Sequence, residues 1–212
     1  MILGYNEYED SCGYLSLKSD AYVTDPAYAP DLWCCNLVRG FLPGKYLAYV
    51  LYNEDEDHIA ELAIYHNNID SRRPKEMMDW EYIADVPVDS GQAGFFDKDS
   101  YIEGKKADEA DKGKSLEEST GFYKECCDIT LDDDPFGTLD SNLGVVSASG
   151  YGDGVYELYV VKDSADRIVA ARIIFIKARN EDEDDDWDDE SQLPPPTKVG
   201  GLQKRASVTS KP

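Results

Sequence analysis

Apolar and polar side chains alternate in two neighbouring runs late in the chain. In residues 155–161, Tyr156, Leu158 and Val160 share one face, and Glu157 lies on the opposite face. Residues 168–176 repeat this alternation. The polar connector at 162–167 is too short for a parallel crossover, so the two runs predict an antiparallel hairpin.

A second pair of apolar runs, residues 45–52 and 59–66, predicts another hairpin. Its connector contains four consecutive acidic residues at 54–57. Carboxylate oxygens suit calcium, but the glycine and the terminal glutamate of an EF-hand loop are missing. A cation-binding loop and a solvated loop are therefore both open, and the missing ligands favour the solvated loop.

Shorter segments complete the pattern. Residues 14–18, 21–23 and 80–88 have the composition of strands. Residues 101–120 are highly charged and poor in apolar side chains, which predicts either a mobile insertion or a short exposed helix. Residues 121–131 return to a core-like composition and predict a short helix that runs into a strand.

These elements predict a mainly β, single-domain fold over residues 1–178. We expect an antiparallel sandwich or a strongly curved sheet with few short helices. Beyond this domain, nine of the ten residues 181–190 are acidic, and three prolines follow at 194–196. Like-charge blocks resist packing and polyproline is extended, so residues 179–212 are predicted to form a disordered, acidic and proline-rich tail.

The charge of the chain limits its partners. The formal net charge is −23, and residues 1–180 alone carry 17 Lys and Arg against 35 Asp and Glu, a balance of −18. Such a field repels nucleic-acid phosphates and anionic membranes, so direct binding to either is not expected. It attracts cations and basic protein surfaces. A nucleic-acid mimic, with carboxylates at phosphate-like spacing, is an alternative.

The number and spacing of the cysteines and histidines match no familiar catalytic or metal-binding motif. The five cysteines include two Cys-Cys pairs at 34–35 and 126–127, and the Cys-x-x-Cys spacing of zinc ribbons is absent. His58 and His66 are the only histidines, and His66 is expected on the surface at a strand end. No signal peptide and no apolar run of membrane-spanning length is visible, so a reducing, cytoplasmic setting is expected.

Two stretches combine glycine with aspartate. Asp89, Ser90 and Gly91 begin a segment that ends at Asp97, and a run of alternate glycines spans residues 149–154 around Asp153. Gly-Asp-Gly is common turn chemistry, so the simpler interpretation is structural. The functional interpretation is a ligand loop or a pocket of carboxylates. Such carboxylates could bind a divalent cation, calcium or magnesium, or carry out acid–base chemistry.

Several short motifs follow one another along the chain: Asp25-Pro26, Pro43-Gly44-Lys45-Tyr46, Trp80, Val88-Asp89-Ser90-Gly91, Phe96-Asp97 and residues 149–156. Taken together, these positions resemble an uncharacterised bacterial family, domain of unknown function 4241. The resemblance implies a β-rich single domain and no established activity. It also makes Asp89, Asp97 and Asp153 candidates for one shared site. The candidate binding residues are Asp89, Ser90, Gly91, Asp97, Ser149, Gly150, Gly152, Asp153, Gly154 and Tyr156.

The leading hypothesis is a non-enzymatic interaction module that binds a basic partner surface, as an immunity or anti-defence type of inhibitor does. It rests on the acidic body and on the absence of a recognisable catalytic set in the sequence. The alternatives are a divalent-metal-binding or metal-dependent hydrolytic site at Asp89, Asp97 and Asp153, and the nucleic-acid mimic.

Overall fold

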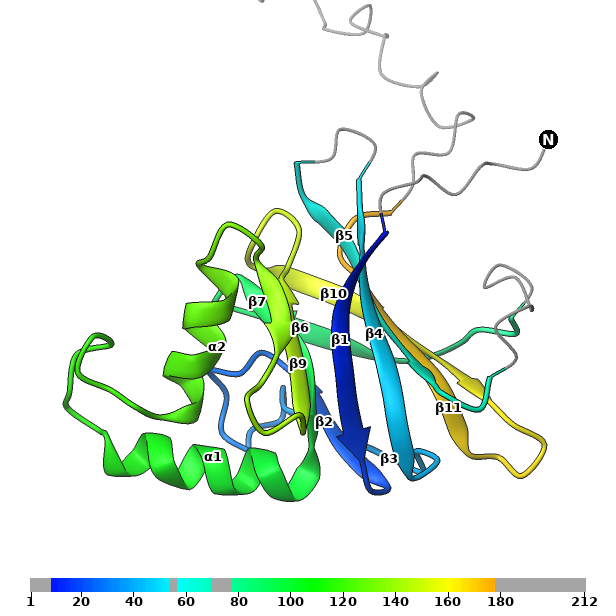
Figure 1. The fold of residues 1–212 in the computed structure, drawn as a ribbon, viewed down its shortest axis with the longest axis horizontal. Coiled ribbons are helices and arrows are strands. Elements are labelled where there is room, and N and C mark those ends of the chain that lie inside the picture. The colour runs from blue at the N-terminus through cyan, green and yellow to red at the C-terminus, as the bar shows by residue number, and fades with distance from the viewer. Residues whose placement is uncertain (1–8, 54–56, 70–77, 178–212) are drawn as a thin grey trace, which may run out of the picture. The chain divides into compact units, whose positions relative to one another are not determined.

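The fold was analysed in a computed structural model that describes residues 9–53, 57–69 and 78–177. Within these residues the chain forms two antiparallel sheets and two helices (Figure 1). The predicted tail at 179–212 and most of the acidic connector at 54–57 lie outside the described residues.

The larger sheet contains both predicted hairpins. β4 pairs with β5 from Tyr46↔His66 to Tyr52↔Ile59, and β10 pairs with β11 from Glu157↔Ile174 to Lys162↔Ile168. Both hairpin predictions are therefore confirmed. In order across the described sheet, the six strands are β1 (Glu9–Leu17), β4 (Gly44–Tyr52), β5 (Ile59–His66), β11 (Ile168–Ile174), β10 (Gly154–Lys162) and β6 (Glu81–Val88).

The smaller sheet draws its strands from both halves of the chain, and the two helices follow its central strand. Across the described sheet the five strands are β3 (Asn36–Arg39), β2 (Asp20–Thr24), β7 (Gln92–Asp97), β9 (Gly144–Ala148) and β8 (Phe136–Thr138). The helices are α1 (Lys98–Ala110) and α2 (Phe122–Thr130). Neither helix is long and apolar enough to cross a bilayer.

The main core lies between the two sheets. Leu62 and Leu158 of the larger sheet and Val23, Phe95 and Val145 of the smaller sheet belong to one cluster of buried side chains. Period-two alternation sends these side chains to the inner faces, because successive strand residues point to opposite sides of a sheet. The prediction of a mainly β fold built from antiparallel sheets is confirmed.

A second core joins the helices to the outer face of the smaller sheet. Phe96 and Val146 of that sheet pack with Tyr101 of α1 and with Phe122 and Cys126 of α2. Tyr101 is fully buried, so the first half of the charged stretch at 101–120 belongs to a packed helix, which ends at Ala110; turns follow over residues 111–120. Figure 1 shows both helices on the side of β7 and β9 that faces away from the larger sheet.

Glycine is required at the centre of β7. Gly94 is buried between β2 and β9, where it pairs with Thr24 and Val146. A Cβ there would collide with the carbonyl oxygen of Val145 and with the ring of Phe96. Because a strand carbonyl cannot move without breaking its ladder, the collision cannot be relieved locally.

We therefore expect Gly94→Ala to lower the free energy of unfolding by about 3 kcal/mol, the upper range for overpacking a core. Gly137→Ala in β8 is the control, since its Cβ would meet a single side-chain atom, the Cγ2 methyl of Ile129 at 3.1 Å, and, apart from its chain neighbours, no backbone atom within 4 Å. That variant should lose less than about 1 kcal/mol. Urea unfolding followed by circular dichroism measures both, and equal losses would contradict the assigned packing of β7.

Candidate functional site

The two glycine–aspartate stretches meet where the chain passes from one sheet to the other. Residues 89–91 lead from β6 of the larger sheet to β7 of the smaller one, and residues 149–153 lead from β9 back to β10. Val88 pairs with Gly154 and Gln92 pairs with Ala148, so the two turns start and end at paired positions. We call this pair of turns, residues 89–91 and 149–153, the crossing corner.

Direct contacts join the two turns. The backbone N–H of Ser149 donates to the carbonyl oxygen of Gly91, with an N···O distance of 3.0 Å. Gly91 has φ 68°, Gly150 φ 57° and Gly152 φ 106°. These are left-handed conformations that favour glycine, and a Cβ on Gly91 would lie 3.9 Å from Cα of Gly152. The alternate glycines are thus explained by the turns themselves.

Ser149 and Tyr156 close the longer turn. The Ser149 hydroxyl donates to the carbonyl oxygen of Gly152 at 2.8 Å, and the Tyr156 hydroxyl contacts the same oxygen at 2.6 Å and that of Ser149 at 3.0 Å. Burial raises the pKa of Tyr156, so its hydroxyl keeps the proton that these carbonyls accept. Both residues, predicted as binding candidates, have their hydroxyl groups engaged in holding the turn.

A buried carboxylate at the end of β2 ties the shorter turn in place. Asp25 is fully buried. Its Oδ2 accepts the backbone N–H groups of Asp89 at 2.9 Å and Ser90 at 2.8 Å. Its Oδ1 accepts the Ser90 hydroxyl at 2.6 Å and the Ala27 N–H at 2.7 Å. Asp25 was not among the predicted site residues, although its Asp-Pro pair belongs to the positions of the family resemblance.

Asp89 and Asp153 are brought to the same end of one ladder, because Asp89 follows Val88 and Asp153 precedes Gly154. Both are exposed. The Tyr28 hydroxyl donates to Oδ2 of Asp89 at 2.7 Å. Burial, followed by this bond, raises the pKa of Tyr28, so the phenol stays neutral.

Asp97 lies elsewhere. It ends β7, and a strand rise of about 3.4 Å per residue puts it about 17 Å from Gln92 at the corner. Its buried carboxylate caps α1 through the N–H of Ser100 at 3.5 Å and accepts the backbone N–H of Lys18 at 3.1 Å. The expected convergence of Asp97 with Asp89 and Asp153 is therefore wrong, because the strand between them separates its two ends.

The other candidate metal and catalytic groups are occupied in packing. All five cysteines are buried and free, and burial raises the pKa of Cys12 to about 12. His66, expected on the surface, is 4% exposed; it packs against Tyr46 with ring centroids 5.0 Å apart. Across residues 9–53, 57–69 and 78–177, no group of three or more His, Cys, Asp or Glu is arranged to hold a metal ion.

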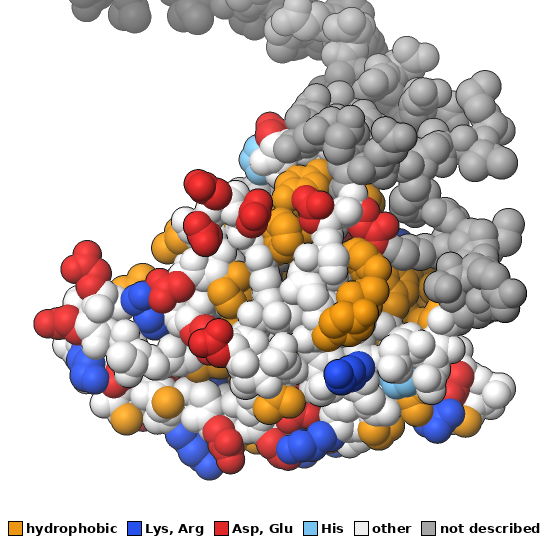
Figure 2. Space-filling view, in the orientation of Figure 1, with side chains coloured by type: hydrophobic (Ala, Val, Ile, Leu, Met, Phe, Trp, Pro, Cys, Tyr) orange, Lys and Arg blue, Asp and Glu red, His pale blue; other side chains and the backbone are white. Residues whose placement is uncertain are grey.

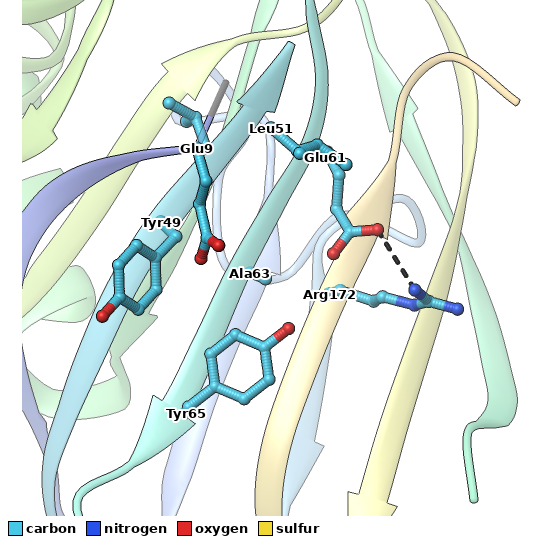
Figure 3. Close-up of a pocket in the computed structure, with 8 residues that line it drawn as sticks. Glu9, Tyr49, Leu51, Glu61, Ala63, Tyr65 and Arg172 are labelled. Carbon is cyan, nitrogen blue, oxygen red and sulfur yellow. Dashed lines mark hydrogen bonds and ion pairs between the residues drawn. The ribbon is translucent and has the colours of Figure 1, made fainter. Parts of the chain in front are cut away.

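The outer face of the larger sheet has a small cavity, shown in Figure 3. Glu61 and Arg172 point toward one another there, with Oε2 and Nη1 3.2 Å apart. The Arg172 guanidinium also lies 4.3 Å from the ring centroid of Trp80. The cavity has a volume of ≈ 20 Å³, room for about one water molecule and not for an organic ligand.

A larger groove of ≈ 530 Å³ runs between α1 and residues 27–31. Its charged lining is balanced, with Lys105, Lys106 and Lys112 beside Asp31, Asp108 and Glu109. The Lys105 amine already donates to the Pro26 carbonyl at 2.9 Å and to Asp108 at 2.8 Å. The groove therefore offers no concentrated charge for a ligand of either sign.

These features define a two-sheet β protein whose motif residues build a corner between the sheets. The chain belongs to the DUF4241 family: the family model, described as "Protein of unknown function (DUF4241)", matches residues 46–173, more than half of the chain. The match begins in β4, ends in β11 and includes both turns of the crossing corner. Searches of curated proteins and of solved structures each found no match.

The role of Asp25 can be tested with the isosteric variant Asp25→Asn. An amide replaces one acceptor oxygen by a donor, so at least one buried N–H group loses its partner. We expect the free energy of unfolding to fall by about 2 kcal/mol in Asp25→Asn and to change by less than about 0.5 kcal/mol in the exposed control Asp31→Asn. Urea titration of both variants checks this, and identical midpoints would refute the structural role.

Proposed function

We propose that the protein is a non-enzymatic interaction module that binds a basic surface of a partner protein, in the manner of an inhibitor that covers it. The observation that carries the proposal is an acidic surface around the crossing corner. Its exposed carboxylates, which we call the acidic corner, are Asp31, Asp85, Asp89, Asp132, Asp133, Asp134 and Asp153.

Contacts between segments bring these carboxylates to one region. The Asn36 amide donates to the carbonyl oxygen of Asp85 at 2.7 Å, which joins the segment of Asp31 to β6. The Thr130 hydroxyl donates to Oε1 of Gln92 at 3.2 Å, which places the end of α2, and the turn at 132–134, beside the corner. In Figure 2, acidic side chains gather where Figure 1 shows α2 and the turn before β10.

Basic residues are missing from the segments that build this surface. Residues 26–38, 80–97, 131–135 and 149–161 contain no Lys and no Arg. On α1 the situation differs, because Asp108 pairs with Lys105 at 2.8 Å and Glu109 with Lys112 at 2.9 Å. Charge on the helix is thus paired locally. Asp31 lines a groove with Lys105 and Lys106, but in the part of the chain that the structure describes no ion pair is formed by the carboxylates of the acidic corner.

Two of the corner carboxylates accept hydrogen bonds from tyrosine hydroxyls. The Tyr82 hydroxyl donates to Asp85 at 3.0 Å, as Tyr28 does to Asp89. The bond to Asp85 raises the pKa of Tyr82 and keeps this donor neutral. A surface on which carboxylates predominate speeds encounter with a cationic surface and selects against acidic partners.

The proposal is tested by capturing partners on the intact chain at low salt and then purifying the captured protein. Its dissociation constant should rise about tenfold or more between about 50 and about 300 mM NaCl, because screening weakens contacts between charged surfaces. A salt dependence no steeper than that of a neutral pair would contradict the proposal.

The location of the surface is tested with two triple variants that remove the same charge. Asp31→Asn/Asp85→Asn/Asp153→Asn neutralises part of the acidic corner. Glu103→Gln/Asp140→Asn/Asp166→Asn is the control, since these exposed residues lie beyond the opposite ends of β7, β9 and β10. We expect the first variant to weaken binding about tenfold or more and the control by less than about threefold. Equal losses would mean that net charge alone, and not the corner, attracts the partner.

A further inference from the structure

An exposed tryptophan stands at the edge of the acidic corner. Trp33 is 88% exposed, and its neighbour Leu32 is 44% exposed. Among the described residues, no hydrogen bond or ring contact is recorded for the Trp33 side chain. Tryptophan normally buries most of its large apolar surface, so one left in water on a folded protein marks a contact site.

The segment that carries Trp33 is held in one conformation. The N–H of Leu32 donates to the Ala29 carbonyl at 3.1 Å, and the N–H of Cys35 donates to the Leu32 carbonyl at 3.0 Å. The residues that follow the tryptophan, Cys34 and Cys35, are buried. An anchor presented on an ordered turn loses little conformational entropy on binding, so its contact energy is available for affinity.

The charge around Trp33 selects the kind of group that covers it. Asp31 precedes it by two residues and is exposed; it lines the groove that holds Lys105 and Lys106, but among the described residues it forms no ion pair with either. The segment also packs beside Asp85 and Asp89 through Asn36 and Tyr28. Aromatic faces attract cations, and tryptophan does so most strongly. A planar guanidinium can stack on an indole and also donate to a carboxylate, whereas a lysine ammonium is a compact, strongly hydrated charge.

We propose that the tip formed by Asp31 and Trp33 takes an arginine side chain of the basic partner, with the guanidinium stacked on the indole and paired with the carboxylate. This inference rests on the proposed function and adds to it a single anchoring contact. It makes the basic surface that this protein binds an arginine-bearing one. The carboxylates of the acidic corner then attract the partner, and the tip discriminates arginine from lysine.

The test uses the intact chain, labelled with fluorotryptophan, and two synthetic probes of equal charge, nona-arginine and nona-lysine. The chain contains three tryptophans, so its fluorine NMR spectrum has three signals, and Trp33→Phe assigns that of Trp33. We expect the Trp33 signal to saturate at about three- to fivefold lower concentration of nona-arginine than of nona-lysine. The Trp80 signal is the internal control, since its ring is already covered by Arg172.

Variants separate binding at the tip, Asp31 and Trp33, from the general attraction of a cationic peptide to an acidic protein. Asp31→Asn should remove most of the preference for arginine at the Trp33 signal. Trp33→Ala should lower the ratio of nona-lysine to nona-arginine dissociation constants, measured with labelled peptides, and Tyr14→Ala should not. Tyr14 is a matched control because it is 53% exposed on β1, at the other edge of the larger sheet from β6.

The outcomes distinguish this inference from the proposed function. One outcome overturns the arginine contact alone. The Trp33 signal would respond equally to both peptides, while partner binding stayed sensitive to salt and was weakened by the triple variant of the acidic corner. The proposed interaction module would then still hold. No response to either peptide at low salt counts against both. A response of the Trp33 signal to phosphatidylcholine vesicles but not to nona-arginine also overturns the inference, because the exposed indole would then serve a lipid surface.

Discussion

The buried carboxylate of Asp25 connects two parts of the chain that are far apart in sequence. Asp25 directly follows β2, and its carboxylate accepts the backbone N–H groups of Asp89 and Ser90 in the turn between β6 and β7. Four donors satisfy it, so its burial is compensated by hydrogen bonds instead of by a cation. This one group fixes where the chain leaves the larger sheet and enters the smaller one, and the second turn rests on the first through Ser149 and Gly91.

The same arrangement explains why the motif side chains have few groups left for chemistry. The Ser90 hydroxyl donates to Asp25, and the Ser149 hydroxyl donates to the Gly152 carbonyl. The Tyr156 hydroxyl contacts the same Gly152 carbonyl. Tyr151 and the carboxylates of Asp89 and Asp153 remain exposed at the corner, and the Asp89 carboxylate accepts its hydrogen bond from the hydroxyl of Tyr28. A structural role for the motifs and an interaction role for the surface are therefore compatible, because different atoms serve each.

Predictions made from the sequence succeeded where local pattern decides the outcome. Both hairpins follow from alternation and short polar connectors, and the helix predicted within 121–131 is present as α2. It does not run into a strand as predicted, because it ends at Thr130 and β8 begins only at Phe136. Predictions failed where a residue's role depends on what packs against it. Tyr101 is buried because Phe96 and Phe122 surround it, and His66 is buried against Tyr46. Phe122 is too far from Tyr101 in sequence, and Tyr46 too far from His66, for either contact to be recognised from residue spacing.

The sequence by itself determined the fold class, the acidity and the position of the glycine-rich turns, since these depend on side-chain alternation, on charge count and on backbone freedom. Only the tertiary structure decided which aspartates come together. Asp89 and Asp153 meet because their strands pair at Val88 and Gly154, whereas Asp97 is carried to the far end of β7 and caps a helix. Asp25 and Trp33 owe their positions to the same cause: strand pairing and packing, and not distance along the chain, set which groups are neighbours and which are left in water.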